Sequence, residues 1–148
     1  MRENGAVELS VTPDELAHEL VESSDSEWLR ELVDALDREG RTSPLRRLTT
    51  LWDLSNAAAA RLFGVSRQAF SKWLTNGPPP DRADDVARVA TITDLLDRYV
   101  KRERIAAVVR RAAPRFSDRS IIEMLEAGEY AEAVEGVEEM FDLRRVQP

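Results

Sequence analysis

The residues best suited to direct chemistry lie in the stretch 66–76, where polar and cationic side chains recur at helical spacing. Arg67 and Gln68 open this stretch, and Ser71 and Lys72 follow about one turn later. Arginine can pair with both acceptors on the edge of a guanine, and glutamine can pair in the same bidentate way with adenine. Lysine and serine can reach either bases or phosphates. These residue types indicate a helix that reads the major groove of double-stranded DNA. Arg67, Gln68, Ser71 and Lys72 are expected to reach the major groove, and Ser66 is also expected to bind DNA.

A helix, a tight turn and a second helix are needed to position these side chains. Ser55 is a favourable N-cap, and the run of four alanines that follows it loses no side-chain entropy in a helix. Gly64 stands where the first helix must end with a positive φ angle, and Ser66 caps the second helix. The pattern predicts a DNA-binding helix-turn-helix, although a plain helical corner also favours glycine. The expected phosphate contacts are Arg46, Arg61 and Asn76. For Arg46, a solvated surface charge is an equal alternative.

Three helices are predicted before this motif. The sequence Thr12-Pro13-Asp14-Glu15 is a capping box with proline at the first helical position, so it begins a helix. A second capping box, Ser24-Asp25-Ser26-Glu27, begins another helix that ends at Gly40, and the two helices are expected to form an acidic hairpin. Their apolar stripe is expected to pack against the rest of the protein or against a second copy. Ser43-Pro44 begins the third helix, which supports the helix-turn-helix.

The chain after the motif is also expected to be helical. Three prolines end the second helix of the motif, and a long connecting helix begins at residue 81. Along it, the basic residues 101–104 and 110–111 are either a solvated face or contacts with the DNA backbone. A third capping box at Ser120 begins a short helix that ends at Gly128, and a last helix follows over about 129–141.

The expected fold class is therefore all-α. It comprises an N-terminal helical hairpin, a helix-turn-helix unit, a long connecting helix and a small C-terminal helical domain. Three domains are expected: an acidic N-terminal extension over 1–43, a DNA-binding domain over 44–80, and the long helix with a C-terminal domain over 81–148.

Net charge is −7, which is unusual for a protein that binds DNA, but the charges are not evenly distributed. Residues 44–80 carry one acidic and five basic residues, a net charge of +4. Residues 1–43 carry a net charge of −8, and residues 117–148 carry −6. The release of counterions from DNA depends on the charge close to phosphate, so the basic centre is able to bind DNA although both ends are acidic.

The composition argues against several classes of protein. The chain of 148 residues has no cysteine and a single histidine, His18, so no metal site, cofactor or catalytic nucleophile is expected and an enzyme is not predicted. No apolar run approaches the roughly 18 residues that span a membrane, and no apolar signal core follows the N-terminus. The expected location is the cytoplasm.

From about Leu54 to Val146 the sequence resembles the Xre/MbcA/ParS antitoxins of bacterial toxin–antitoxin systems. One basis is the helix-turn-helix motif. The other is the run from Ser120 to Tyr130, which is similar to the short helix, glycine turn and closing helix of that family. The resemblance implies an antitoxin that binds operator DNA, represses its own operon and neutralises a RES-domain toxin, which degrades NAD. The toxin-facing residues that it implies are Gly128, Glu129, Tyr130, Phe141, Arg144 and Arg145.

The alternative to an antitoxin is a stand-alone helix-turn-helix repressor whose C-terminal helices only dimerise. Both interpretations share the DNA site and differ in the protein partner. A homodimer on a palindromic operator is expected in either case, because one helix-turn-helix gives modest affinity.

Overall fold

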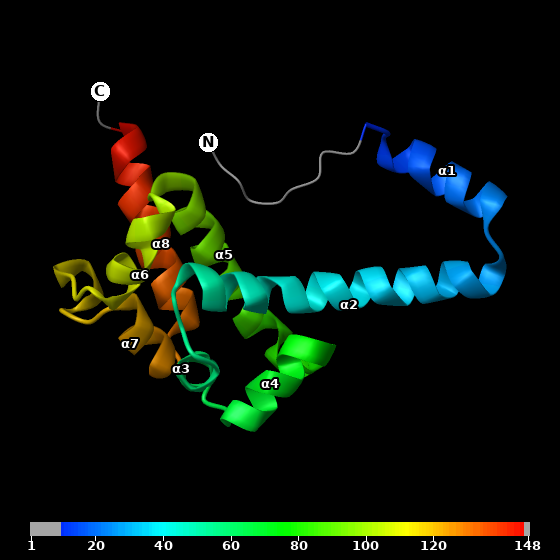
Figure 1. Ribbon diagram of the computed structural model, residues 1–148. Helices are drawn as coiled ribbons and strands as arrows, with labels where there is room; N and C mark the ends of the chain where they lie inside the picture. Colours follow the sequence, from blue (N-terminus) through cyan, green and yellow to red (C-terminus); the bar gives the residue numbers. More distant parts are fainter. Residues whose placement is uncertain (1–9, 147–148) are drawn as a thin grey trace. The chain divides into compact units, whose positions relative to one another are not determined.

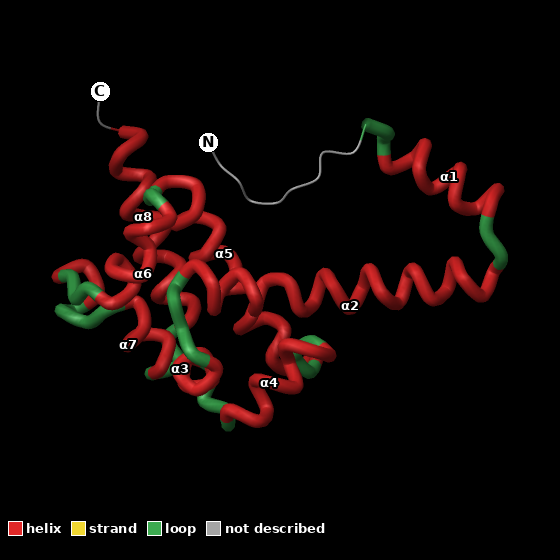
Figure 2. Tube along the Cα trace, in the orientation of Figure 1, coloured by secondary structure: helices red, strands yellow, loops and turns green. Residues whose placement is uncertain are grey.

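The computed structural model describes residues 10–146 of the chain and the side chains up to residue 142. Figures 1 and 2 show that this part is helical, and it contains no strand. The predicted all-α class is confirmed. The chain divides into two compact units, an N-terminal unit, Met1–Asp37, and a C-terminal unit, Arg38–Pro148. The helices are α1 (Pro13–Ser23), α2 (Ser26–Leu51), α3 (Asn56–Leu62), α4 (Arg67–Asn76), α5 (Ala83–Tyr99), α6 (Arg102–Arg110), α7 (Ile121–Glu126) and α8 (Tyr130–Val146).

The N-terminal unit consists of α1 and the first part of α2. The predicted capping box of α1 is confirmed, because Thr12 Oγ1 accepts the Glu15 backbone N–H and Glu15 accepts the Thr12 N–H. The predicted cap of α2 is wrong by one residue: Asp25, not Ser24, accepts the Trp28 N–H at 2.8 Å. No side chain between residues 10 and 37 is buried.

The prediction that one helix ends at Gly40 and another begins at Ser43 is wrong, because α2 continues through both positions. Pro44 has no N–H to donate to the Gly40 carbonyl, and a proline inside a helix costs about 3 kcal/mol. The residues that follow it offset this cost, since Leu45, Leu48 and Trp52 are all at most 1% exposed. Burial of this apolar face therefore overrides the local signals that end and begin a helix.

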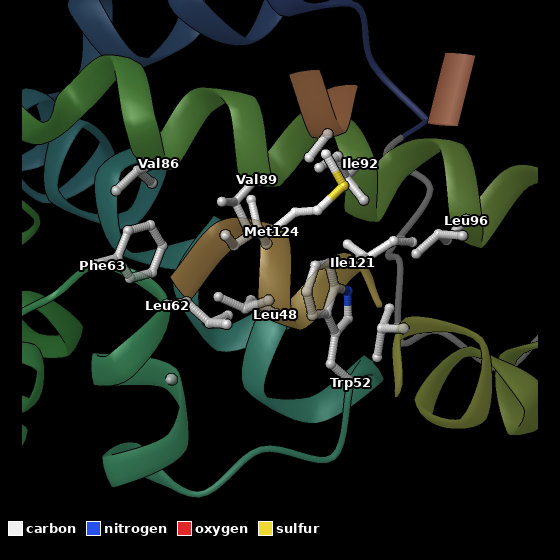
Figure 3. Packing of buried hydrophobic residues seen from close by; sticks show 14 of the residues in the cluster. Leu48, Trp52, Leu62, Phe63, Val86, Val89, Ile92, Leu96, Ile121 and Met124 are labelled. Carbon is white, nitrogen blue, oxygen red and sulfur yellow. The ribbon is translucent and has the colours of Figure 1, made fainter. Parts of the chain in front are cut away.

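The hydrophobic core lies in the C-terminal unit and joins α2 to every later helix. Figure 3 shows Leu48 and Trp52 beside Leu62, with Ile121 and Met124 facing them from α7. Val89, Ile92 and Leu96 cover this cluster from α5. The core thus contains residues from both the 44–80 and the 81–148 segments, and the position of α3 depends on both.

The connecting helix is shorter than predicted. A 3₁₀ turn at Pro80–Arg82 precedes α5, which ends at Tyr99, and the chain bends at Val100 before α6 begins. In the C-terminal unit, α5 packs along α8 (Figure 1). Among the described residues, no helix is both long enough and apolar enough to cross a membrane.

Gly136 in α8 lies close against the 3₁₀ turn Pro114–Phe116. A Cβ atom placed there would lie 2.2 Å from Cε1 of the Phe116 ring, which is itself buried. A side chain of any size would therefore force the ring or the helix to move.

We expect Gly136→Ala to lower the free energy of unfolding by about 1–3 kcal/mol, because overpacking outweighs the gain in helix propensity. Gly40→Ala in α2 is the matched control, since nothing lies within 4 Å of a Cβ at that position. The control should be as stable as the wild type or up to about 1 kcal/mol more stable. Urea unfolding followed by circular dichroism measures both, and equal effects of the two substitutions would contradict the steric argument.

Candidate nucleic-acid interface

The turn between α3 and α4 is closed by the backbone itself. As the sequence predicts, Ser55 caps α3 and Gly64 adopts a positive φ angle of 64°. The Val65 N–H donates to the Ala60 carbonyl at 3.1 Å, and the Gly64 N–H donates to the Arg61 carbonyl at 3.2 Å. This pair of bonds is a Schellman motif, which provides two of the last carbonyl groups of a helix with partners.

The next two carbonyl groups receive hydrogen bonds from distant side chains. The Tyr130 hydroxyl, at the start of α8, donates to the Leu62 carbonyl at 2.6 Å. Arg82 Nη2 donates to the Phe63 carbonyl, and its guanidinium carbon lies 5.6 Å from the centre of the Trp73 ring. Burial raises the pKa of Tyr130, which keeps the phenol protonated and able to donate. A cation at the C-terminal end of a helix also interacts favourably with the helix dipole.

One face of α4 is buried and the opposite face is exposed. Phe70 and Trp73 are 0% and 7% exposed, and both pack against Phe63 of the turn. Ser66 caps the helix as predicted, with its hydroxyl accepting the Ala69 N–H at 3.0 Å. The backbone of α4 is therefore fixed at its first turn and along its inner face. The side chains exposed on the opposite face are Arg67, Gln68, Ser71, Lys72, Thr75 and Asn76.

The exposed side chains at the start of α4 have no partners within the protein. Among residues 10–146, no ion pair or side-chain hydrogen bond involves Arg67, Gln68, Ser71 or Lys72. These side chains are thus available to an external ligand. Thr75 is exposed on the same face, three residues after Lys72, but is not among the contacts predicted from the sequence. Helical spacing alone is sufficient to identify it.

The expected phosphate contacts are distributed over three helices. Arg61 of α3 and Asn76 at the end of α4 are exposed. Arg46 of α2 is also exposed, but it already forms an ion pair with Glu39 at 2.6 Å and a hydrogen bond with Thr42 at 2.9 Å. A contact between Arg46 and phosphate would therefore have to compete with a carboxylate of the same helix.

The residues expected to face a toxin do not form one exposed surface. Gly128 is exposed in the turn before α8, whereas Tyr130 is half-buried and stacks on Phe63 at 6.3 Å. Phe141 is 2% exposed and stacks on Tyr99 at 4.6 Å between ring centres, so its side chain faces the core. The Arg144 and Arg145 side chains lie outside the described residues.

Glu129, the remaining toxin-facing candidate, is held by an ion pair within the protein. Its carboxylate accepts two hydrogen bonds from Arg119, which forms an isolated antiparallel β-bridge with Ala113 in the loop before α7. The hydrogen bond from Arg119 holds the pKa of Glu129 below its ordinary value, and the same bond raises the pKa of Arg119. The pair fastens the start of α8 beside α7.

Comparison with protein-family models, with curated proteins and with solved structures finds no match to this chain. The conclusions about function therefore depend on the geometry of the residues themselves.

We expect Glu129→Gln to lower thermal stability at pH 7, because the ion pair with Arg119 is lost. Since the folded pKa of Glu129 is lowered, the stabilisation is complete above the ordinary glutamate pKa of about 4.3 and disappears as the pH falls through the folded value. The difference between the variant and the wild type should thus shrink as the pH falls below about 4 in thermal melts. Glu126→Gln, at an exposed position, is the control, and a difference that does not shrink on acidification would contradict the argument.

Proposed function

We propose that α3 and α4 form a helix-turn-helix that binds double-stranded operator DNA, with α4 in the major groove, and that the protein represses its own operon. The observation that carries this proposal is the exposed face at the start of α4. Arg67, Gln68, Ser71 and Lys72 have no partners among the described residues, while the opposite face is buried in the core. In helix-turn-helix proteins the N-terminal residues of the second helix contact base edges.

The local charge supports this proposal although the whole chain is acidic. The segment 44–80 carries a net charge of +4, with Arg61, Arg67 and Lys72 exposed on α3 and α4. Each phosphate that a cation neutralises releases counterions, and this gain depends on nearby charges and not on the net charge of the molecule. The excess of acidic residues in 1–43 and 117–148 lies in other segments.

The rigidity of α4 also supports base readout. A side chain distinguishes bases only if its backbone is held in one orientation relative to the groove. The N-cap of Ser66, the buried Phe70 and Trp73 and the closed turn before them provide that support. One such unit covers a short site, so we propose that two copies bind a palindromic operator.

We expect Arg67→Ala and Gln68→Ala each to cost about 1–3 kcal/mol of binding free energy on the preferred operator and to relax its sequence preference. Lys72→Ala should weaken binding to all duplexes and should reduce the slope of log K against log salt by about one, as the loss of a phosphate contact does. The operator is first obtained by selection of random duplexes with the wild-type protein, and affinities are then measured by fluorescence anisotropy.

Arg98→Ala is the control for these measurements, because Arg98 is an exposed arginine on α5, outside the proposed interface. It should bind the selected operator as the wild type does. If the Arg67→Ala/Gln68→Ala double variant also binds like the wild type, or if selection enriches no duplex, α4 does not read DNA.

We also propose that the protein is the antitoxin of a type II toxin–antitoxin system and that its partner is a RES-domain toxin. An exposed acidic face on α8 supports a role for the C-terminal helices in binding a protein, since it suits a basic cleft and would speed association. The exposed glutamates of this face are Glu132, Glu135, Glu138 and Glu139. The competing function is a stand-alone repressor whose C-terminal domain only dimerises.

We expect co-expression with the product of the adjacent gene to yield a complex and to relieve toxicity and NAD loss caused by that product. Reversal of the α8 charges in Glu135→Lys/Glu138→Lys should abolish both effects and leave operator affinity unchanged. The reversal Asp14→Lys/Glu15→Lys, at two exposed positions in the first turn of α1, is the matched control. Full repression by this protein alone, with no toxic neighbour, would favour the stand-alone repressor.

A further inference from the structure

The C-terminal unit contains a groove that shares no residue with the candidate nucleic-acid interface. Its volume is about 620 Å³, and its walls come from the end of α5, from α6, α7 and α8, and from the 3₁₀ turn Pro114–Phe116. Figure 1 shows α6, α7 and α8 next to one another around it. Sites for small molecules are typically clefts of about 300–1,000 Å³. The groove is therefore of a size that accommodates a small molecule.

The floor of the groove is apolar and belongs to the core. Phe116, Ile121 and Phe141 line it, and each of them is at most 5% exposed. The partly buried Val108 and Met140 extend the apolar lining towards solvent. Because the buried residues are held by the rest of the core, this floor does not have to be assembled when a ligand arrives. An apolar molecule that lies on it gains hydrophobic burial.

The rim of the groove is cationic along a single face of α6. Lys101, Arg104 and Arg111 line the groove and are exposed, and their spacing of three and seven residues places them on one side of the helix. Ala107 lies between them on the same face. None of the three cations pairs with a carboxylate in the described part of the chain, and no described carboxylate lines the groove. The positive charge of the rim is thus left for an external anion.

The internal contacts of the neighbouring bases show that this charge is not a general property of α6. Arg102 forms an ion pair with Asp97, and Arg110 donates to two backbone carbonyls in the turn after α2. Helix stability does not explain the cations at the start of the rim either. Lys101 is the N-cap of α6 and Arg104 lies in its first turn, where the helix dipole disfavours positive charge.

We propose that the groove is a binding site for a small anionic amphiphile, a molecule with an apolar body and a carboxylate at one end. The body lies on the floor formed by Phe116, Ile121 and Phe141, and the carboxylate accepts charge-assisted hydrogen bonds from the cations of the rim. This proposal does not depend on the binding of DNA.

The dimensions and the chemistry of the groove favour a small molecule over a macromolecule. The cationic wall, α6, has nine residues, which is about 14 Å of helix. A stable protein partner needs roughly 800 Å² of surface on each side, more than a groove along one short helix offers. A nucleic acid would place phosphates against the rim but would leave the apolar floor without a partner, because the DNA backbone is charged and hydrated.

The test uses the full chain, with decanoate as the probe and with methyl NMR signals as the measurement. Decanoate should shift the methyl signals of Val108 and Ile121 in a saturable way. A dissociation constant of about 1 mM or lower is expected, the range that ligand efficiency gives for a molecule of this size. The methyl signals of Val33 in the N-terminal unit, which is 63% exposed, serve as the internal reference and should not follow the same curve.

Two further probes separate the contributions of the chain and the charge. Acetate has the carboxylate without the apolar body, and decyltrimethylammonium has the same chain with the opposite charge. Neither should shift the Val108 and Ile121 signals at the concentrations at which decanoate saturates them. Equal binding of decyltrimethylammonium would show an unselective apolar surface and would overturn the proposal.

Two variants remove the charge of the rim by different routes. Arg104→Gln/Arg111→Gln should weaken decanoate binding at least about tenfold, because the carboxylate loses charge-assisted hydrogen bonds. Ala107→Glu places a carboxylate three residues from Arg104 and four from Arg111, the spacing of ion pairs on a helix. It should weaken binding to a similar extent without disturbing the fold, since position 107 is exposed.

The matched controls make the same changes outside the groove. Arg61→Gln/Arg67→Gln removes two exposed arginines of α3 and α4, and Ala131→Glu adds a carboxylate at an exposed position of α8. Both should bind decanoate as the wild type does. The Arg67→Ala/Gln68→Ala variant should also bind it, so failure of this proposal is distinguishable from failure of DNA binding.

Three other results would overturn the proposal. The first is the absence of any saturable shift at Val108 and Ile121 with decanoate. The second is an affinity for decanoate that neither rim variant changes. The third is a shift of these signals with an acidic amphipathic peptide but not with decanoate, which would assign the groove to a protein partner.

Discussion

Closure of the C-terminal end of α3 is the constraint on which the candidate interface depends. Four successive carbonyl groups, from Ala60 to Phe63, lie beyond the last helical hydrogen bonds of this short helix and need partners from elsewhere. The turn provides partners for the first two, Tyr130 for the third and Arg82 for the fourth. Because the two side chains come from α8 and from the turn before α5, the direction in which α4 leaves the turn is determined by the fold of the whole C-terminal unit.

The aromatic residues around the turn transmit this constraint to α4. Phe63 contacts Phe70, Trp73 and Tyr130, with ring centres between 5.6 and 6.3 Å apart. Phe63 therefore connects the inner face of α4 to the first residue of α8. A helix of ten residues has little stability of its own in water, so its tertiary contacts are what hold it rigid. Tyr130, which the family resemblance suggests for contact with a toxin, is thus also part of the support of α4.

Features that depend on a few adjacent residues could be predicted from the sequence, and those that depend on distant partners could not. Caps at Ser55, Ser66 and Ser120 and the positive φ angle at Gly64 are local, and the structure has all four. The uninterrupted helix through Pro44 could not be predicted, because burial of residues that follow it decides the outcome. The Leu62 carbonyl is bonded by Tyr130, 68 residues away, and the Phe63 carbonyl by Arg82, 19 residues away. No local sequence pattern predicts either partner. The sequence therefore predicts the exposed residues of the candidate site, but it does not predict the contacts that hold α4 in place.

Segregation of charge distinguishes the exposed start of α4 from most of an acidic chain. Residues 44–80 carry a net charge of +4, whereas residues 10–37 carry −8. The apolar side chains of α4, Phe70 and Trp73, are already buried, so its exposed face offers a ligand charge and hydrogen bonds but little hydrophobic surface. A face of this kind suits a hydrated polyanion better than an amphipathic helix, because most of the binding energy of an amphipathic helix comes from burial of its apolar side chains.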